Sequence, residues 1–205
     1  AKPSFRELNP NPSFNPATGE AEFGNAGVSF QNAGATDTIL PEEFSGLQLV
    51  EVDNFDIRGE WFLSDDELIS VSLFHKKVDG PIERIKVPTG GGASFTFFNN
   101  DNEAEMNGAE FEFRVSMSRL SDWLRDFYSG GNYTYIDASV ERSSLEAIAL
   151  PGSAPNERSL FNQPENILNA FIGYQNEEYG LDVTLSANQV GRQLYAVTSE
   201  GDIFN

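Results

Sequence analysis

Two glutamates lie two residues apart in the middle of the chain, in the stretch GAEFEFRVSM that runs from Gly108 to Met117. Paired carboxylates on one face of a strand can act together as a general acid and a general base. Here Glu110 and Glu112 are followed at the same spacing by Arg114, and such a row of charges is typical of a solvated wall. We therefore favour the structural interpretation and predict that the chain is not an enzyme.

The other residue types able to do chemistry give weaker signals. His75 is the one histidine, and no cysteine exists to join it in a metal site, so we expect no metal or catalytic role for it. Oxygen ligands gather in NNDNEAE, residues 99–105, but they lack the spacing of a calcium-binding EF-hand loop, which favours a solvated loop. The GGG at 90–92 precedes neither a helix nor a Lys-Ser/Thr pair, so it is not a phosphate loop. We expect no metal and no cofactor.

Composition sets outer bounds on the partners. The 205 residues suffice for one domain or two small ones, and the formal net charge of −19 disfavours nucleic acid and anionic membrane surfaces while suiting cations. The absence of cysteine excludes disulfides and thiolate metal sites. The sequence contains no run of about 18 apolar residues, so we expect no transmembrane helix. The opening AKPSFRELNP lacks the apolar core of a signal peptide.

Alternating apolar and polar residues predict the elements that position these side chains. We expect an all-β fold, an antiparallel β-meander of about six long strands in which each strand pairs with its neighbour in sequence. The predicted strands cover residues 54–63, 68–78, 104–120, 127–140, 165–175 and 181–192. We expect residues 1–51 to be mostly loop, 52–197 to form the hairpin strands, and 198–205 to begin another loop.

The alternation leaves open which face of each strand is inside. In GAEFEFRVSM, Phe111, Phe113 and Val115 share one face, opposite the charged row described above. A soluble β-sandwich or β-barrel buries its apolar face, whereas a transmembrane barrel turns that face to lipid and lines a wet interior with the polar one. Both alternatives fit this single stretch.

Three features favour the transmembrane barrel. The alternating runs have about 10 residues or more, as membrane strands need, whereas globular strands average about 5–6. The short connections SDDE, SDWLRD and NEEYG alternate with long ones, as in outer-membrane barrels. Aromatic residues lie beside the short turns, as in an interfacial girdle: Trp61, Phe62, Trp123, Phe127, Tyr128, Tyr174 and Tyr179. We therefore predict that Leu73 and Leu185 face lipid together with Phe111, Phe113 and Val115.

Five segments resemble the barrel of TonB-dependent outer-membrane receptors: KPSFREL, GEWFLSDDELISVSLFHKKVDGPIE, NGAEFEFR, GGNYTYIDA and NAFIGYQNEEYGLDVTLSANQVGR. The resemblance covers all six strands and all three short turns. It implies a 22-stranded barrel that is plugged by an N-terminal domain and captures its ligand at the extracellular face. No plug domain, TonB box or terminal aromatic strand is visible in the chain. The resemblance therefore implies about a quarter of a receptor, from the C-terminal barrel region.

The resemblance also implies location, partners and function. We expect the outer membrane of a Gram-negative-type bacterium, contact with outer-membrane lipid, and a TonB complex that acts through a plug domain outside this chain. The expected function is binding a scarce nutrient for uptake, from the siderophore, cobalamin or saccharide class, and a soluble binding module stays the alternative. Phe95, Phe97 and Phe98 lie in the long connection 79–103, which we place outside the cell. We predict that this exposed aromatic cluster contacts ligand, with packing against neighbouring loops as the competing interpretation.

Overall fold

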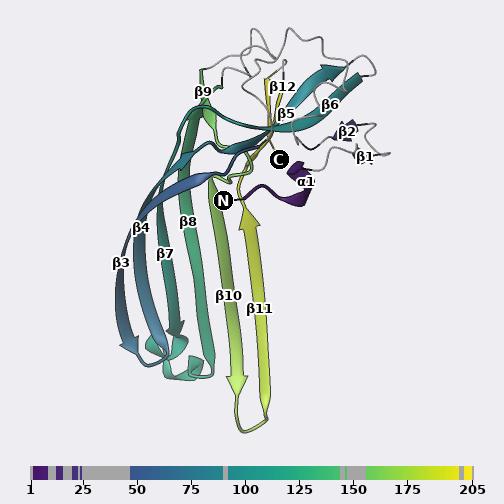
Figure 1. Cartoon of the computed structure of the whole chain (residues 1–205). Helices are drawn as coiled ribbons and strands as arrows, with labels where there is room; N and C mark the ends of the chain where they lie inside the picture. Colours follow the sequence, from purple (N-terminus) through teal and green to yellow (C-terminus); the bar gives the residue numbers. More distant parts are fainter. Residues whose placement is uncertain are drawn as a thin grey trace.

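The computed structural model describes residues 2–8, 13–15, 20–22, 24, 47–89, 92–143, 146, 156–198 and 201–204. Six long strands form one curved sheet, which we call the wall (Figure 1). The wall consists of β3 (Glu51–Ser64), β4 (Glu67–Asp79), β7 (Ala104–Ser116), β8 (Phe127–Glu141), β10 (Asn166–Asn176) and β11 (Leu181–Val190). Each strand pairs antiparallel with its neighbour, in the order β11-β10-β8-β7-β4-β3. The predicted all-β meander is confirmed.

The three short connections lie together at the bottom of the wall in Figure 1, which we call the turn end. Residues 65–66 join β3 to β4, and residues 177–180 join β10 to β11. Between β7 and β8 the chain forms two single 3-10 turns, η1 (Met117–Arg119) and η2 (Asp122–Leu124). The third strand was predicted to reach Leu120, but it ends at Ser116, because the Ser116 hydroxyl accepts a bond from the Ser118 amide and caps η1.

A second, six-stranded sheet lies at the other end of the wall, at the top of Figure 1. It contains β1 (Ser13–Asn15), β2 (Glu20–Glu22), β5 (Ile82–Thr89), β6 (Gly92–Asn99), β12 (Leu194–Thr198) and β13 (Gly201–Phe204), in the order β1-β2-β6-β5-β12-β13. The single turn α1 (Phe5–Leu8) precedes it in the chain, and β9 (Glu157–Ser159) pairs with the end of β8. We call the six-stranded sheet together with β9 the upper lobe.

Three predicted loops are partly strand in the structure. The long connection 79–103 folds into the β5–β6 hairpin, β1 and β2 interrupt the predicted loop 1–51, and β13 occupies residues 201–204 of the segment 198–205. The pairings β2–β6 and β5–β12 are parallel and join segments far apart in sequence. The hairpins β1–β2, β5–β6 and β12–β13 are local, but alternation along one strand carries no information about the distant partners that join these hairpins into one sheet.

A small hydrophobic core lies where the wall meets the upper lobe. Ala104, Met106, Ile136, Val140 and Leu160 are buried in it, and Phe74, Val78 and Ala138 pack against it. Leu160 follows β9 directly, so the core holds this connection against the upper part of β7 and β8. No helix within the described ranges has the length and apolar character needed to cross a membrane.

Candidate functional site

The strand register divides the wall into two chemically different faces, because residues directly opposite each other in an antiparallel sheet point to the same side. Leu73 pairs with Ile57 and Ala109, Phe111 with Val71 and Tyr133, and Leu185 with Ile172. The apolar face is made of Phe55, Ile57, Trp61, Ile69, Val71, Leu73, Phe111, Phe113, Val115, Tyr133, Tyr135, Leu168, Ile172, Tyr174, Val183 and Leu185. The register confirms that Phe111, Phe113, Val115, Leu73 and Leu185 share one face.

The apolar face is largely exposed. Phe55 is 68% exposed, Trp61 67% and Leu185 72%, and Ile57, Leu73 and Val183 are more than half exposed. A soluble monomer rarely leaves a continuous apolar surface of this extent in water. The face therefore needs an apolar environment outside the described chain.

The opposite, polar face carries a network of side-chain hydrogen bonds. Arg58 donates from Nε to Glu60 and from Nη2 to Glu112, both at 2.7 Å. A row of amides crosses the next strands: Asn188 donates to Asn169, Asn169 to Asn132 at 2.7 Å, and Asn132 to Glu110 at 3.2 Å. Glu110 and Glu112 thus have separate partners, and the two carboxylates form part of a polar wall.

Three aromatic rings on the polar face occupy the space above glycines of a neighbouring strand. Phe74 lies opposite Gly108, Phe171 opposite Gly130, and Tyr128 opposite Gly173. A Cβ atom added to these glycines would come within 2.1, 2.5 and 2.1 Å of the respective ring. Only glycine leaves room for such contacts, which lock two strands in one register. We call these three contacts the ring–glycine joints.

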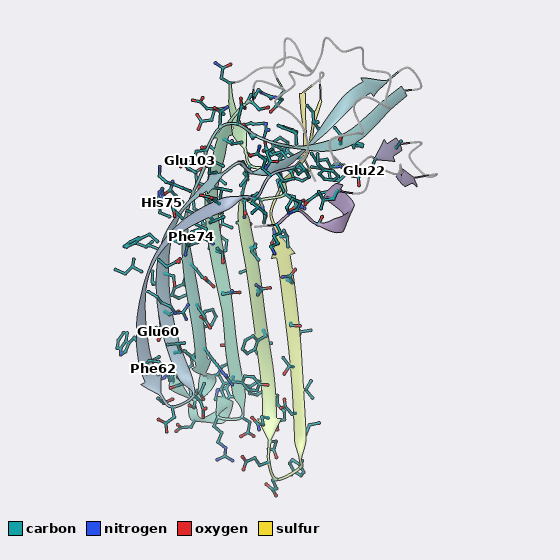
Figure 2. The ribbon with its side chains drawn as sticks, in the orientation of Figure 1. Glu22, Glu60, Phe62, Phe74, His75 and Glu103 are labelled. Atoms are coloured by element: carbon teal, nitrogen blue, oxygen red, sulfur yellow. The ribbon has the colours of Figure 1, made fainter. Side chains whose placement is uncertain are left out.

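The predicted aromatic girdle is divided between the two faces. Trp61, Phe127 and Tyr174 share the apolar face, and the rings of Phe127 and Tyr174 are 5.0 Å apart. Phe62 and Tyr128, by contrast, share the polar face, because Leu68, the partner of Phe62, pairs in turn with Arg114, and Tyr128 pairs with Ser116. Figure 2 shows Phe62 close to the turn end, beside Glu60. The girdle prediction was therefore wrong for these two residues, since proximity to a turn does not determine the face.

A cavity of about 700 Å³ opens at the turn end. Tyr128, Asp182 and Arg114 of the polar face line it, with acidic residues of the turns around them. Glu67 also lines the cavity, and its carboxylate accepts hydrogen bonds from the Ser116 amide at 2.8 Å and from Arg119 at 2.5 Å. The hydrogen bond to Glu67 raises the pKa of Arg119 above its ordinary value. These contacts tie the two neighbouring short connections together.

A buried ionic cluster joins the wall to the upper lobe. Arg158 of β9 donates from Nη1 and Nη2 to the two carboxylate oxygens of Glu83 in β5, at 2.7 and 2.6 Å. Its Nε and Nη2 donate to Glu146 at 3.1 and 2.8 Å, and Arg142 pairs with Glu146 as well. Asn100 donates to Glu83 and to the backbone carbonyl of Glu141 at the end of β8. We call Arg142, Glu146, Glu83 and Arg158 the ionic tetrad.

The tetrad is withdrawn from water. The side chains of Arg158, Glu83 and Glu146 are 1%, 0% and 0% exposed. Burial lowers the pKa of Arg158, but its hydrogen bonds and charge interactions with Glu83 and Glu146 outweigh burial and raise the pKa above its ordinary value. Two arginines balance two glutamates, so the tetrad carries no net charge.

A second ionic contact uses the next residue of β5. Arg84 donates from Nε to Glu22 of β2 at 2.9 Å, and its Nη2 lies 2.8 Å from the same carboxylate oxygen. Its guanidinium lies 3.6 Å from the ring centre of Phe95 and 4.6 Å from that of Tyr195. Cation–π contacts of this kind strengthen when they are shielded from water. Arg84 thus connects β5 with β2, β6 and the region of β12.

Comparison with known protein families assigns this chain to one of them. The family described as TonB dependent receptor-like, beta-barrel, matches residues 2–203, nearly the whole chain. The chain belongs to this family. TonB-dependent receptors are outer-membrane β-barrels with a role in transport, and the wall has the antiparallel meander expected of a barrel section. A search among curated proteins finds no match.

Membership of this family indicates where the upper lobe lies in the barrel, which the sequence pattern alone did not. In a TonB-dependent receptor the short turns and the long connections mark opposite rims of the barrel. The upper lobe is built on the long connections, so it occupies the rim opposite the turn end. The sequence resemblance anticipated the family, but the alternation predicted these connections to be mostly loop.

Phe95, Phe97 and Phe98 lie in β6 of the upper lobe and are 1%, 4% and 2% exposed. Their expected position in an exposed loop was wrong, because the β5–β6 hairpin takes its place in a sheet whose other strands come from distant segments. Phe95 also meets Tyr195 edge to face, with ring centres 6.3 Å apart. Their contact with ligand stays a prediction, but the exposure on which it was based is absent.

The remaining polar candidates are engaged with other protein groups. The Nδ1 atom of His75 lies 2.8 Å from the side-chain oxygen of Asn107, its neighbour across β4 and β7. In NNDNEAE, Asn100 bonds Glu83, Asn102 bonds the carbonyl of Arg142, and Glu103 pairs with Lys77 at 2.7 Å. Figure 2 places His75 and Glu103 at the end of the wall that adjoins the upper lobe. Within the described ranges, no group of three or more acidic, histidine or cysteine side chains is arranged to hold a metal ion.

Sequence reasoning missed both the tetrad and the ring–glycine joints. Arg158 and Glu83 are 75 residues apart, and neither stands in a motif. The joints left a faint signal, since Gly108, Gly130 and Gly173 interrupt otherwise regular strands, where a glycine marks a close approach. The partner ring follows only once the register is known.

Proposed function

We propose that this chain is a section of the barrel of an outer-membrane receptor that binds a scarce nutrient and passes it inward in a TonB-driven process. One observation carries the proposal: a wall one sheet thick has an exposed apolar face on one side and a hydrogen-bonded polar face on the other. The apolar face contacts outer-membrane lipid. The polar face lines the barrel interior.

The arrangement of side chains supports binding and transport rather than catalysis. Glu110 and Glu112 are held by separate partners, and His75 bonds Asn107 at the edge of the upper lobe. The TonB complex acts through the plug domain of the receptor, and the net charge of −19 of this chain disfavours nucleic acid as a partner. The same charge favours a cationic or metal-bearing nutrient among the siderophore, cobalamin and saccharide classes.

The competing function, a soluble β-sandwich module, requires a cover for the apolar face. In a sandwich, a second sheet packs about 10 Å from the first and interdigitates with its side chains. The second sheet of this molecule lies at the end of the wall (Figure 1), and Leu73, Phe111 and Leu185 stay 54%, 44% and 72% exposed. The sandwich alternative therefore lacks its central feature in the described part of the chain.

Uptake measurements on the full-length receptor test the proposal. The gene is deleted from its bacterium, and accumulation of a labelled ferric siderophore, cobalamin and an oligosaccharide is measured before and after complementation. We expect accumulation of one class to fall with the deletion, to return with the gene, and to fall equally when TonB is removed. Unchanged accumulation of nutrients in the deletion strain, or uptake by the receptor without TonB, would contradict the proposed function.

A further inference from the structure

Strand β5 occupies a special position in the upper lobe, because two consecutive residues with opposite charges point to its two sides. Side chains alternate along a strand, so Glu83 and Arg84 necessarily face opposite directions. Both are buried, at 0% and 5% exposure. Each is bound by partners from different parts of the chain. One strand therefore carries two separate ionic contacts within two residues.

The contacts on the Glu83 side attach β5 to the rim of the wall. Arg158 binds both carboxylate oxygens of Glu83, and Asn100 bridges Glu83 to the end of β8. Arg158 also binds Glu146, which lies in the connection between β8 and β10. This side joins the connection β4–β7 to the connection β8–β10.

The contacts on the Arg84 side attach β5 to the beginning and the end of the chain. Glu22 belongs to β2, which pairs parallel with β6, and Tyr195 belongs to β12, which pairs parallel with β5. These parallel pairings are short, with register partners at two positions for β2–β6 and one for β5–β12. Backbone pairing of this length is weak, so the side chains around Arg84 hold β2 and β12 in place.

We propose that Glu83 and Arg84 make β5 the central link of the connections at this rim. Because of this link, β2, the β5–β6 hairpin, β9 and β12 open and close together. Arg158 and Arg84 are then positioning residues for the rim where, under the proposed function, ligand is captured. The inference rests on the proposed function only for this last consequence. The coupled opening itself is a property of the fold.

Native-state hydrogen exchange on the full-length receptor in liposomes tests the coupling without any ligand. Amides that open in one cooperative unit share one opening free energy and one dependence on denaturant. We expect amides of β2, β5, β6, β9 and β12 to share a single value, distinct from that of β10 and β11 in the wall. Separate values for β2, β9 and β12 would overturn the proposal. Because this measurement uses the unaltered receptor, it distinguishes coupled from independent opening even if every variant fails to fold.

Two variants and a matched control sharpen the result. Arg158→Met removes the contact on the Glu83 side, and Arg84→Met removes the contact on the other. We expect each to speed exchange about tenfold or more throughout β2, β9 and β12, including the strand that lost no contact. Acceleration confined to β9 in the first variant and to β2 and β12 in the second would refute the proposal that β5 links these strands.

Arg58→Met is the matched control, because it removes an arginine with two glutamate partners from the wall. We expect it to leave exchange in β2, β9 and β12 unchanged. Glu83→Gln keeps the shape of the side chain and replaces Arg158→Met if that receptor does not assemble. A failure of nutrient uptake with intact coupled exchange would reject the proposed function alone. Independent exchange with intact uptake would reject only the proposal that β5 links the strands of this rim.

Discussion

The wall and the upper lobe use the same ion pairs in opposite surroundings. On the wall, Arg58 binds Glu60 and Glu112 with side chains that are 38–39% exposed. In the upper lobe, Arg158 binds Glu83 and Glu146 at nearly the same distances, but with side chains that are 0–1% exposed. Exposed pairs are screened by water and contribute little, whereas breaking a buried pair leaves an uncompensated charge.

The difference shows that the two regions are held together by different means. The wall has continuous backbone ladders, with registers of nine or more residue pairs between neighbouring strands, so its side chains are free to suit what lies on each face. In the upper lobe only β5 and β6 form a long ladder, the other strands have three to five residues, and buried side chains hold segments that are distant in sequence. We therefore expect charge changes to be costly in the lobe and mild on the polar face of the wall.

The largest effect is expected at Arg158. Replacing it by Met leaves Glu83 and Glu146 buried without their main partner, and such losses typically cost about 3–5 kcal/mol. The opening free energy of β9, measured by hydrogen exchange on the full-length receptor, should therefore fall by about 3–5 kcal/mol. A change smaller than about 1 kcal/mol would show that the tetrad does not hold the lobe.

Leu73→Arg should give the next largest effect, because it places a charge on the apolar face near the middle of β4. In a membrane barrel such a substitution costs about 2–4 kcal/mol at mid-membrane. The matched variant Ser72→Arg points to the polar face, where Ser72 pairs with Glu110, and should cost much less. Urea titration of receptor folding in liposomes measures both. Equal losses would contradict the distinction between the two faces.

The ring–glycine joints give an intermediate prediction. A Cβ on Gly173 would lie 2.1 Å from Tyr128 Cζ and 2.5 Å from its hydroxyl oxygen, so the ring must leave its contacts with Thr184 and Asp182. We expect Gly173→Ala to destabilise folding by about 1–3 kcal/mol, as overpacking does. Gly59→Ala, where nothing lies within 4 Å of the added Cβ, is the control and should have almost no effect. A loss at Gly173 that persists undiminished in a Tyr128→Ala background would show that the ring is not the cause.

The smallest effect is expected at Arg58. Its pairs with Glu60 and Glu112 are exposed, and the carboxylates can be solvated when the arginine is gone. Arg58→Met should fold in liposomes with a midpoint that cannot be told apart from that of the unaltered receptor. A clear loss of stability would show that the polar face is less accessible to water than the comparison with Arg158 requires.

The wall was predictable because its information is local. A period of two along each strand predicts the strand and its faces, and the short turns set the order in which the strands pair. Thus Phe111 and Glu112 were assigned to opposite faces correctly before their partners were known. The family resemblance rests on the same segments, so it too could be recognised from local sequence.

The upper lobe was not predictable in the same way. IERIKV hints at a strand, and ASFTFF alternates only in part. The two segments pair with each other as the β5–β6 hairpin, but the strands on either side of that hairpin, β2 and β12, lie far away in sequence. The ionic tetrad consists of common residues without a motif, and charged side chains normally favour the surface. Phe95, Phe97 and Phe98 were therefore assigned to a loop, although they form a buried part of β6.

One measurement tests most directly whether the apolar face of the wall meets lipid. A fluorophore is attached at position 113 or at position 112 of the full-length receptor in liposomes, and a quencher confined to the lipid phase is added. Phe113 belongs to the apolar face and Glu112 to the polar face, so the account predicts strong quenching at 113 and weak quenching at 112. Equal protection at both positions, or stronger quenching at 112, would contradict it.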